Sequence, residues 1–401
     1  MRTIGVVTTS RADYGIYRPL LESIRSDREL HLRLLVSGMH LSPEYGRTVS
    51  EIEADGFEIA DRVEVLLSSD TPEAISKSMG LALIGFAQVF ARWCPDILLV
   101  SGDRFEMFAA ALAAVAFKVP MAHLGGGDLT EGAIDDVLRH SLTKLSHLHF
   151  TDTAEAARRV IQMGEEPWRV IVSGEPSLDN LRTVRRLTKE QLEANYPFCV
   201  SQPFLLVTYH PVTLQYELAG WQIDQLLSAL QECSMPVIIT MPNADTANRS
   251  IRDKIQSFVA KNSSAWLADN LGTEAYFSVM ALAAAIVGNS SSGVVEAASF
   301  KLPAVNVGIR QAGRVRAKNV IDVGNTSGEI IAGIKQATDP NFRDLLRELV
   351  NPYGTGCAVP HIVAKLKEVK IDDRLLQKRF YDFSSTRQTG TPQDEGLSHQ
   401  V

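Results

Sequence analysis

Short, almost wholly apolar runs recur along the chain, and stretches with helical spacing of apolar residues separate them. Strands that helices cover on both faces have this continuous apolar character, whereas half-exposed strands alternate apolar and polar residues. The pattern therefore predicts βαβ units that form a parallel sheet. In the first half the strand runs are TIGVVTTS, HLRLLVSG, RVEVLLS, DILLVSGD, PMAHLG and HLHFTD, at residues 3–10, 31–38, 62–68, 96–103, 120–125 and 147–152.

A polar and charged segment at residues 170–198 interrupts this rhythm, and the same pattern starts again after it. We interpret this segment as a hinge between two domains of similar build. The strand runs of the second half are PFLLVTYHP, MPVIITMPN, SAWLAD, AAIVGNSS and LPAVNVG. The sequence thus predicts an α/β protein with two doubly wound, Rossmann-like domains that face each other across a cleft.

The domain limits follow from the same pattern. We place the first domain at residues 1–175 and the second at residues 176–370, and 401 residues suit two domains of ordinary size. A last helix is predicted at residues 371–384. Residues 385–401 have almost no apolar side chains to bury, so we expect a disordered tail there.

Composition excludes several classes of function. The apolar runs at residues 107–117 and 278–288 are shorter than the ~20 residues that span a bilayer, and the N-terminus leads directly into a strand run. We therefore expect no membrane span, no signal peptide and a cytoplasmic protein. The net charge of −7 gives no overall attraction to nucleic acid. The four cysteines form no Cys-x-x-Cys pair, so we expect neither a metal site nor a redox motif.

Ligands of open α/β sheets bind at the carboxyl ends of the strands. The loop GNSSSGVVEAASF, residues 288–300, is most like a phosphate site, because small residues let backbone N–H groups approach an anion and a following helix adds its positive end. Ser290 and Ser291 would hold a diphosphate there, or would only cap that helix. Glu296, about one turn into the helix, would accept hydrogen bonds from sugar hydroxyls or be a solvated acid. The chain has neither a P-loop nor a Gly-x-Gly-x-x-Gly motif, which disfavours a nucleotide hydrolase and a dinucleotide cofactor.

Basic residues stand at the same edges. Arg11, Arg104 and Arg310 each follow a strand run, and the fork of a guanidinium matches phosphate. Any one of them would also serve as a surface salt bridge, but three at one edge favour an anion site. His210, which ends the first strand run of the second half, titrates near neutral pH and lies at the predicted cleft, with a structural role as the alternative.

Acidic residues also gather at these turns. Asp103 ends a buried strand run, so its carboxylate should be partly desolvated, as suits a base. Asp135 and Asp136 begin a helical stretch, where capping is the simplest role. We expect Glu106 to be solvated. Two histidines on one strand lack a third ligand at metal spacing.

Together and in order, these motifs resemble the hydrolysing UDP-N-acetylglucosamine 2-epimerases of sialic-acid and related nonulosonate biosynthesis. The resemblance covers nearly the whole chain and rests on TTSRADYGIYRPLL, SGDRFEMFAAA, GAIDDVLRHSLTKLSHLHF, TYHPVT, MPNAD and GNSSSGVVEAASFKLPAVNVGIRQAGR. It implies a GT-B arrangement, with the active site between the domains and a C-terminal helix that crosses back onto the first domain. It also implies a homo-oligomer, a dimer or tetramer, and a reaction without metal or redox cofactor.

The implied reaction has two steps. The C2 proton is removed and UDP leaves C1, which gives a 2-acetamidoglycal; water then adds with inversion at C2, which releases the free sugar. By the resemblance, Asp103 and Asp135 are catalytic, and we count His210 with them. The positions that match UDP-binding residues are Arg11, Arg104, His210, Asn243, Ser290, Ser291, Glu296 and Arg310.

One position departs from the family. In HLGGGD, residues 123–128, Gly125 stands where the family often has the glutamate of His-x-Glu-Gly-Gly, a catalytic acid/base candidate. Either Asp128 takes over that role, or the missing side chain makes room for a bulkier sugar. The second explanation makes UDP-2,4-diacetamido-2,4,6-trideoxyglucose, of the legionaminic-acid route, a substrate candidate beside UDP-GlcNAc.

Three other functions would use the same fold. A non-hydrolysing epimerase would return the nucleotide sugar, and a GT-B glycosyltransferase would pass the sugar to an acceptor. The motifs RAD, GDRFE and GAIDD favour the hydrolysing branch. A nucleotide-sugar-binding regulator without catalysis is the non-enzyme alternative, and Gly125 is the feature that supports it.

Overall fold

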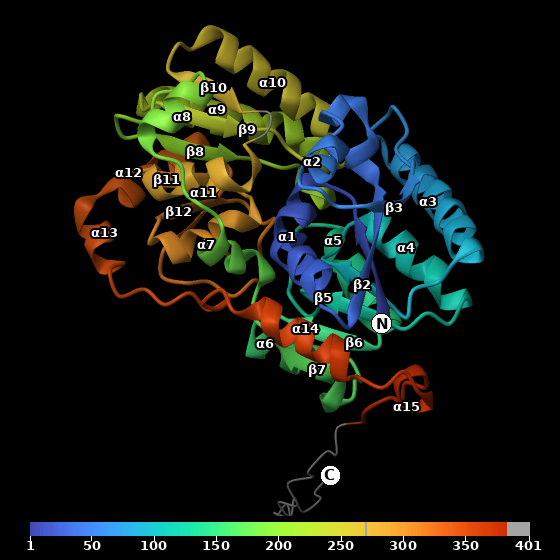
Figure 1. Cartoon of the computed structure of the whole chain (residues 1–401). Coiled ribbons are helices and arrows are strands. Elements are labelled where there is room, and N and C mark those ends of the chain that lie inside the picture. Colours follow the sequence, from blue (N-terminus) through green and yellow to red (C-terminus); the bar gives the residue numbers. More distant parts are fainter. Residues whose placement is uncertain (269–270, 383–401) are drawn as a thin grey trace, which may run out of the picture.

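Two parallel β-sheets, each flanked by helices, form the two domains of the computed structural model, which describes residues 1–268 and 271–382 (Figure 1). The first sheet has seven strands in the order β3-β2-β1-β4-β5-β6-β7, and the second has six in the order β10-β9-β8-β11-β12-β13. In each sheet the chain starts in the middle, runs to one edge and then builds the other side, as in Rossmann-like domains. The predicted fold class is confirmed.

The strands are β1 (Arg2–Thr8), β2 (Leu30–Ser37), β3 (Ile59–Val63), β4 (Ile97–Ser101), β5 (Met121–Leu124), β6 (Leu148–Thr151), β7 (Val170–Val172), β8 (Leu205–Thr208), β9 (Val237–Thr240), β10 (Ala265–Ala268), β11 (Ala285–Gly288), β12 (Ala304–Val307) and β13 (Val320–Val323). The α-helices are α1 (Arg11–Ser26), α2 (Val49–Ala54), α3 (Pro72–Arg92), α4 (Phe105–Ala116), α5 (Asp135–Leu145), α6 (Ala154–Gln162), α7 (Asn180–Thr183), α8 (Lys189–Asn195), α9 (Ala219–Cys233), α10 (Asn248–Lys261), α11 (Gly272–Leu282), α12 (Ser327–Thr338), α13 (Pro340–Leu345), α14 (Ala358–Glu368) and α15 (Asp373–Leu376). The 3-10 helices are η1 (Gly38–Leu41), η2 (Pro43–Tyr45), η3 (Pro167–Arg169), η4 (Pro176–Asp179), η5 (Thr213–Leu218), η6 (Ser291–Gly293) and η7 (Ala297–Phe300).

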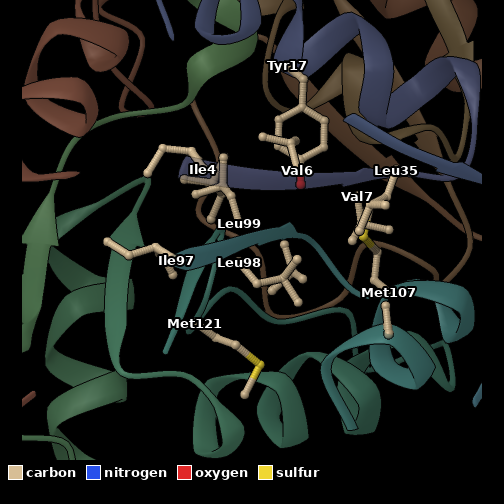
Figure 2. Close-up of a cluster of buried hydrophobic side chains, with 14 of the residues drawn as sticks. Ile4, Val6, Val7, Tyr17, Leu35, Ile97, Leu98, Leu99, Met107 and Met121 are labelled. Atoms are coloured by element: carbon tan, nitrogen blue, oxygen red, sulfur yellow. The ribbon is translucent and has the colours of Figure 1, made fainter. Parts of the chain in front are cut away.

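The inner strands are continuously apolar because helices cover both of their faces. β1 and β4 pair in the middle of the first sheet, and the side chains of Ile4, Val6 and Leu99 are wholly buried. Figure 2 shows this cluster together with Tyr17 from α1 and Met107 from α4. Burying one such aliphatic side chain contributes about 1.5–3 kcal/mol. This core fixes the carboxyl ends of β1 and β4, where candidate site residues follow.

In each sheet, the sequence pattern missed one of the two edge strands. β7 lies in the segment that we interpreted as a hinge, and β13 was not predicted. β7 has only three residues, and its Val172 is exposed; β13 is interrupted by the exposed Asp322. Edge strands with one partner bury less, and their sequence signal is weaker.

The chain returns to the first domain earlier than predicted. α14, which we placed in the second domain, packs in the core of the first through Val359, Ile362 and Leu366 (Figure 1). The returning segment therefore begins at Ala358, not at residue 371. Its apolar spacing gave no sign of which domain it would contact, because either core could bury such a face.

The last described residues complete this return. α15 has four residues, so the helix predicted over residues 371–384 is mostly wrong. Leu375 is buried in the first core, and Arg169 donates hydrogen bonds to the carbonyl oxygens of Arg374 (2.6 Å) and Leu375 (2.8 Å). The tail predicted at residues 385–401 lies outside the described residues.

By length and composition alone, α3 (Pro72–Arg92) is long and apolar enough to cross a membrane. The apolar runs from which no membrane span was expected are shorter and do not include it. Helices that pack on a protein core meet the same criterion. Phe86 and Phe90 of α3 are buried in the first core, and any side chain at Gly85 would collide with Val63 of β3. Packing on the sheet thus accounts for the buried face of α3, whereas Leu81 and Ile84 of the same helix are exposed.

Asp179→Ala tests how α14 is held. The buried carboxylate of Asp179 accepts hydrogen bonds from the backbone N–H groups of Ala358 (2.8 Å) and Val359 (3.1 Å) at the start of α14. Its loss leaves two buried donors without partners, so we expect the free energy of unfolding to fall by about 2 kcal/mol. Urea denaturation followed by tryptophan fluorescence measures this. An unchanged midpoint would show that α14 is held by its apolar face alone.

Candidate active site between the two domains

An open recess of about 300 Å³ lies where the carboxyl ends of the two sheets meet. Residues of both domains line it, so the predicted position of the site between the domains has a matching space. The lining residues are Ile75, Arg104, Phe105, Ile134, Asp135 and Leu138 from the first domain and Thr213, Ala244, Asp245 and Thr246 from the second. The domains also touch beside it, where the N–H of Ile134 donates to the hydroxyl of Thr213 (2.9 Å).

Asp103 follows β4 and is held by Arg139 of α5. Nη2 of Arg139 donates to Oδ2 of Asp103, and this ion pair is largely shielded from solvent. Burial alone would raise the pKa of Asp103, but four guanidinium groups lower it below its ordinary value. They belong, in decreasing order of effect, to Arg139, Arg314, Arg310 and Arg104. Asp103 is thus held in the ionised form that a base needs.

Asp135 has the opposite electrostatic environment. It is the first residue of α5 and lines the recess. Burial raises the pKa of Asp135 to about 7, and the negative charges of Asp103 and Asp245 add to this rise. Its neighbour Asp136 accepts a hydrogen bond from the N–H of Thr130 (2.6 Å). The structural role that the sequence allowed for the pair therefore applies to Asp136, whereas Asp135 can exchange a proton near neutral pH.

Arg104 connects the two domains. Its Nε and Nη2 donate to the carboxylate of Glu106 at 3.1 and 3.2 Å, and its Nη1 donates to Asp245 of the second domain at 3.3 Å. The expectation of a solvated Glu106 is wrong, because this side chain is wholly buried. A buried carboxylate needs a cation, and Arg104 supplies it. A contact between Arg104 and phosphate stays a prediction.

His210 follows β8 and is fixed in its neutral form. Burial lowers the pKa of His210 well below its ordinary value, and the charges of Arg310 and Arg104 lower it further. The N–H of Asn243 donates to its Nδ1 (3.3 Å), so the ring proton lies on Nε2. Asn289 accepts from the backbone N–H of His210 (2.7 Å) and donates to its carbonyl oxygen (2.8 Å). His210 therefore suits a hydrogen-bond donor to an anion better than a general acid.

The serine loop follows β11 without the predicted α-helix. Two short 3-10 helices, η6 and η7, come after it, and the N–H of Val295 between them donates to the carbonyl oxygen of Ser291 (2.8 Å). Ser290 caps η6 and accepts from the N–H of Ser292 (3.4 Å). Gly288 has φ +131, and any side chain there would collide with the carbonyl oxygen of Thr208. Hydroxyl and N–H groups, without a helix dipole, are what this loop offers an anion.

Glu296 and Arg310 lie on either side of that loop. Oε1 of Glu296 accepts from the hydroxyl of Ser177 (2.7 Å), and burial raises the pKa of Glu296. The solvated alternative for Glu296 is therefore wrong. Arg310 follows β12, and its Nη1 donates to the carbonyl oxygen of Asn289 (3.2 Å), next to Ser290. The structure thus brings the predicted UDP-binding positions of the second domain together.

Asp128 joins the same charged cluster as Asp103. Its side chain is 4% exposed and lies 3.7 Å from Nη1 of Arg314, and its carbonyl oxygen accepts from Arg139 (3.1 Å). Gly125, the position that departs from the family, lies near another acid: it has φ +73, and a Cβ there would lie 3.6 Å from Oδ2 of Asp152. A carboxylate is therefore present beside the position that lacks a side chain.

Arg11 opens α1 at the carboxyl end of β1. Asp13 of the same motif is buried, and its carboxylate accepts from the N–H of Thr9 (3.0 Å) and the hydroxyl of Ser10 (3.0 Å), so it shapes the turn. Arg11 lies near His40, whose pKa is lowered first by burial and also by the Arg11 charge. A contact between Arg11 and UDP stays a prediction.

Several charged residues of the site were missed. Arg139 lies one turn after Asp135, a spacing that places both on one face of α5 and was a usable signal. Asp152 ends a buried strand run in the same way as Asp103. Arg314 and Asp245 gave no comparable signal, because loop positions carry no periodicity. Within residues 1–268 and 271–382, no group of three or more His, Cys, Asp or Glu is arranged to hold a metal ion.

Comparison with known proteins agrees with this geometry. A family described as UDP-N-acetylglucosamine 2-epimerase matches residues 22–367. The GDP/UDP-N,N'-diacetylbacillosamine 2-epimerase (hydrolyzing) of Campylobacter jejuni is 39% identical over 323 residues, which are 80% of this chain and 84% of that protein. The UDP-N,N'-diacetylbacillosamine 2-epimerase (hydrolyzing) of Legionella pneumophila is 35% identical over 379 residues, 94% of this chain and 99% of that protein.

A solved structure shares the fold. The crystal structure of UDP-GlcNAc 2-epimerase from Neisseria meningitidis bound to UDP-GlcNAc superposes with a TM-score of 0.78. The sequences are 20% identical, and the match covers 91% of this chain and 99% of that one. The GT-B type of arrangement predicted from the sequence is thereby confirmed.

The pKa of Asp135 gives a test of the site without substrate. An acid whose pKa is about 7 in the folded protein and about 4 unfolded destabilises the fold as pH rises between those values, because ionisation then favours the unfolded chain. Asp135→Asn cannot ionise. We therefore expect the melting temperature of the variant, relative to the wild type, to increase steadily from about pH 4 to about pH 7. A difference that is constant over this range would contradict the raised pKa.

Proposed function

This chain belongs to the UDP-N-acetylglucosamine 2-epimerase family, and we propose that it is a hydrolysing 2-epimerase that converts a UDP-N-acetylhexosamine into the free 2-epimeric sugar and UDP. One observation carries the proposal. Asp103 is kept ionised by surrounding guanidinium groups, while the neighbouring Asp135 has a pKa of about 7. Neighbouring carboxyl groups whose pKa values are pushed apart are the usual basis of acid and base roles.

The first step is an elimination. Asp103 accepts the C2 proton, the C2–H electron pair forms the C1–C2 double bond, and the bond from C1 to the diphosphate oxygen breaks. The departing diphosphate needs donors that are already in place. Arg310, Nε2–H of neutral His210 and the Ser290 loop supply them from the second domain, and Asp135 in its protonated form can give a proton to the leaving oxygen.

The second step adds water to the glycal. Ionised Asp135 is suited to accept a proton from the attacking water as its oxygen bonds to C1, because its pKa lies near neutral pH. C2 takes a proton on the face opposite the one that lost it, since its configuration inverts. Asp103 served the first face, and Asp128, the candidate from sequence, is paired with the Arg314 guanidinium. The proton that C2 receives is therefore assigned to neither Asp103 nor Asp128.

The recess favours a sugar with apolar substituents. Ile75, Phe105, Ile134 and Leu138 line it beside Asp135. UDP-N,N'-diacetylbacillosamine is the 2,4-diacetamido-2,4,6-trideoxy sugar, with a methyl group at C6 and an acetamido group at C4. Such groups gain from apolar contact, whereas the hydroxyls of UDP-GlcNAc would lose hydrogen bonds with water there. The Campylobacter and Legionella relatives carry this substrate in their names.

The product defines the wider role. A free 2-epimeric acetamido sugar is the precursor that nonulosonic acid synthesis needs, so we place the enzyme at that entry. The cytoplasmic location stays a prediction from the sequence, and assembly into a dimer or tetramer stays a prediction from the resemblance.

The proposed function is tested on the purified wild type in deuterated water, with UDP-N,N'-diacetylbacillosamine and UDP-GlcNAc as separate substrates. We expect proton NMR to show free sugar that carries deuterium at C2, with UDP formed in equal amount. The value of kcat/KM for the diacetamido sugar should be at least about ten-fold higher, because burial of one or two additional apolar groups contributes that much free energy. A nucleotide sugar as the only product would overturn the hydrolysing function, and a preference for UDP-GlcNAc would overturn the substrate assignment.

Asp103→Asn tests the base. We expect turnover to fall by at least about a thousand-fold, because the amide cannot accept the C2 proton, while UDP affinity by calorimetry changes little. Asp96→Asn is the matched control: Asp96 stands at the other end of β4, exposed, and accepts from the N–H of Thr3 (2.7 Å). Its activity should stay near that of the wild type. Near-full activity in Asp103→Asn would remove Asp103 from the mechanism.

A further inference from the structure

Two carboxyl groups lie side by side at the carboxyl edge of the first sheet, Asp152 buried and Glu175 partly buried. Asp152 follows β6 and is 5% exposed, and Glu175 follows β7 and caps η4 by accepting from the N–H of Ser177 (3.1 Å). Burial raises the pKa of Asp152 well above its ordinary value, and the charge of Glu175 adds to this. Burial likewise raises the pKa of Glu175 to about 7. Two carboxyl groups in such contact cannot both be ionised, so they share a proton.

The surroundings of the pair contain polar atoms that lack partners. Among the described residues, Oδ1 of Asp152, Oε2 of Glu296 and Nε of Arg314 are buried and have no hydrogen-bond partner. Buried polar groups without partners are costly, and a cluster of them is the mark of a place that a polar ligand or water occupies. The other oxygen of Asp152 faces position 125, where a Cβ would lie 3.6 Å away. Because position 125 is glycine, no side chain of that residue fills the space in front of this oxygen.

The charges around the pair come from both domains. Asp128 and Glu175 raise the pKa of Asp152, and Glu296 and Asp128 raise that of Glu175. Arg314 is the nearest cation: it lowers the pKa of Asp152, and its own charge is stabilised by Asp128, by Asp103 and by Asp152. The phenol of Tyr353 donates to the carbonyl oxygen of Val315 (2.9 Å), so it is not a proton donor to the pair. The charge of Arg314 thus acts on both Asp103 and Asp152.

We propose that Asp152 and Glu175 hold one shared proton beside the sugar and that Asp152 delivers it to C2 when water adds to the glycal. This inference rests on the proposed function and names the donor that the first two carboxyl groups leave unassigned. It also explains how the chain works with glycine at position 125: the proton source comes from the neighbouring strands β6 and β7, while Asp103 and Asp135 act from β4 and α5. Inversion at C2 requires two separate carboxyl groups, one that removes the proton from one face and one that adds a proton to the other.

The O–H bond of Asp152 breaks and a C2–H bond forms with the electrons of the double bond, while the water oxygen bonds to C1 and the water proton passes to Asp135. The pair is left without its proton and regains one from solvent, and Asp103 gives to solvent the proton that it took in the first step, so these two exchanges cancel. The water proton restores Asp135, which gave its own proton to the leaving oxygen of UDP. UDP releases that proton when its terminal phosphate ionises.

Asp152→Asn tests this step, since an amide has no proton to give at neutral pH. We expect the variant to release UDP from the substrate but to accumulate the 2-acetamidoglycal, so that the ratio of glycal to free sugar rises at least ten-fold over the wild type by NMR. Asp179→Asn is the control for loss of a buried acid near Glu175, because the carboxylate of Asp179 accepts hydrogen bonds from the N–H groups of Ala358 and Val359 at the start of α14. Its product ratio should equal that of the wild type.

Glu175→Gln provides a second variant with a different readout. Removing the Glu175 charge lowers the pKa of Asp152, and the donor works only while it is protonated. The fall in free-sugar formation with rising pH should therefore begin at least one pH unit lower than in the wild type. An unchanged pH profile, or an Asp152→Asn variant whose UDP release and sugar formation fall equally, would overturn the inference. If the wild type itself forms no free sugar, the proposed function fails instead.

Discussion

The balance between guanidinium groups and carboxylates in the cleft is the constraint on which the site depends. Carboxylates that are removed from water are unstable unless cations or shared protons compensate them. Arg139 and its neighbours supply enough positive charge to keep Asp103 ionised, but not enough for every acid nearby. Asp135 and the Asp152–Glu175 pair therefore have raised pKa values. This shortage of cations lowers the stability of the fold. It also provides the cleft with carboxyl groups that exchange protons near neutral pH.

The parallel sheets make this concentration of charge possible. Each strand delivers one loop to the same edge, so residues that are distant in sequence meet there. In the first domain this edge carries acids and their arginines, and in the second it carries His210 and the serine loop. Arg104, which pairs with Glu106 in its own domain and with Asp245 in the other, joins the two halves. Proton transfer and diphosphate binding are thus divided between two rigid cores and brought together at their boundary.

Sequence reasoning located most of this and failed in ways that have physical reasons. The inner strands, their order of appearance, and Asp103, His210 and Ser290 followed from apolar runs that end in polar loops. The edge strands β7 and β13 were missed because β7 has only three residues, inside a segment rich in polar residues, and Asp322 interrupts the apolar run of β13. Glu106 was misjudged because its cation, Arg104, folds back on it, a contact that spacing of two residues does not indicate. The docking of α14 on the first domain depends on which core lies nearer, which no local pattern contains.

The account is tested most directly by a crystal structure with bound UDP. If the cleft is the active site, the diphosphate lies between the domains, in contact with Arg310 and Ser290, and the terminal phosphate oxygen points toward Asp103 and Asp135. Asp152 would then face the space that the sugar fills beside Gly125. UDP bound elsewhere on the second domain, with Asp103 turned to solvent and distant from the diphosphate, would contradict the account at its centre.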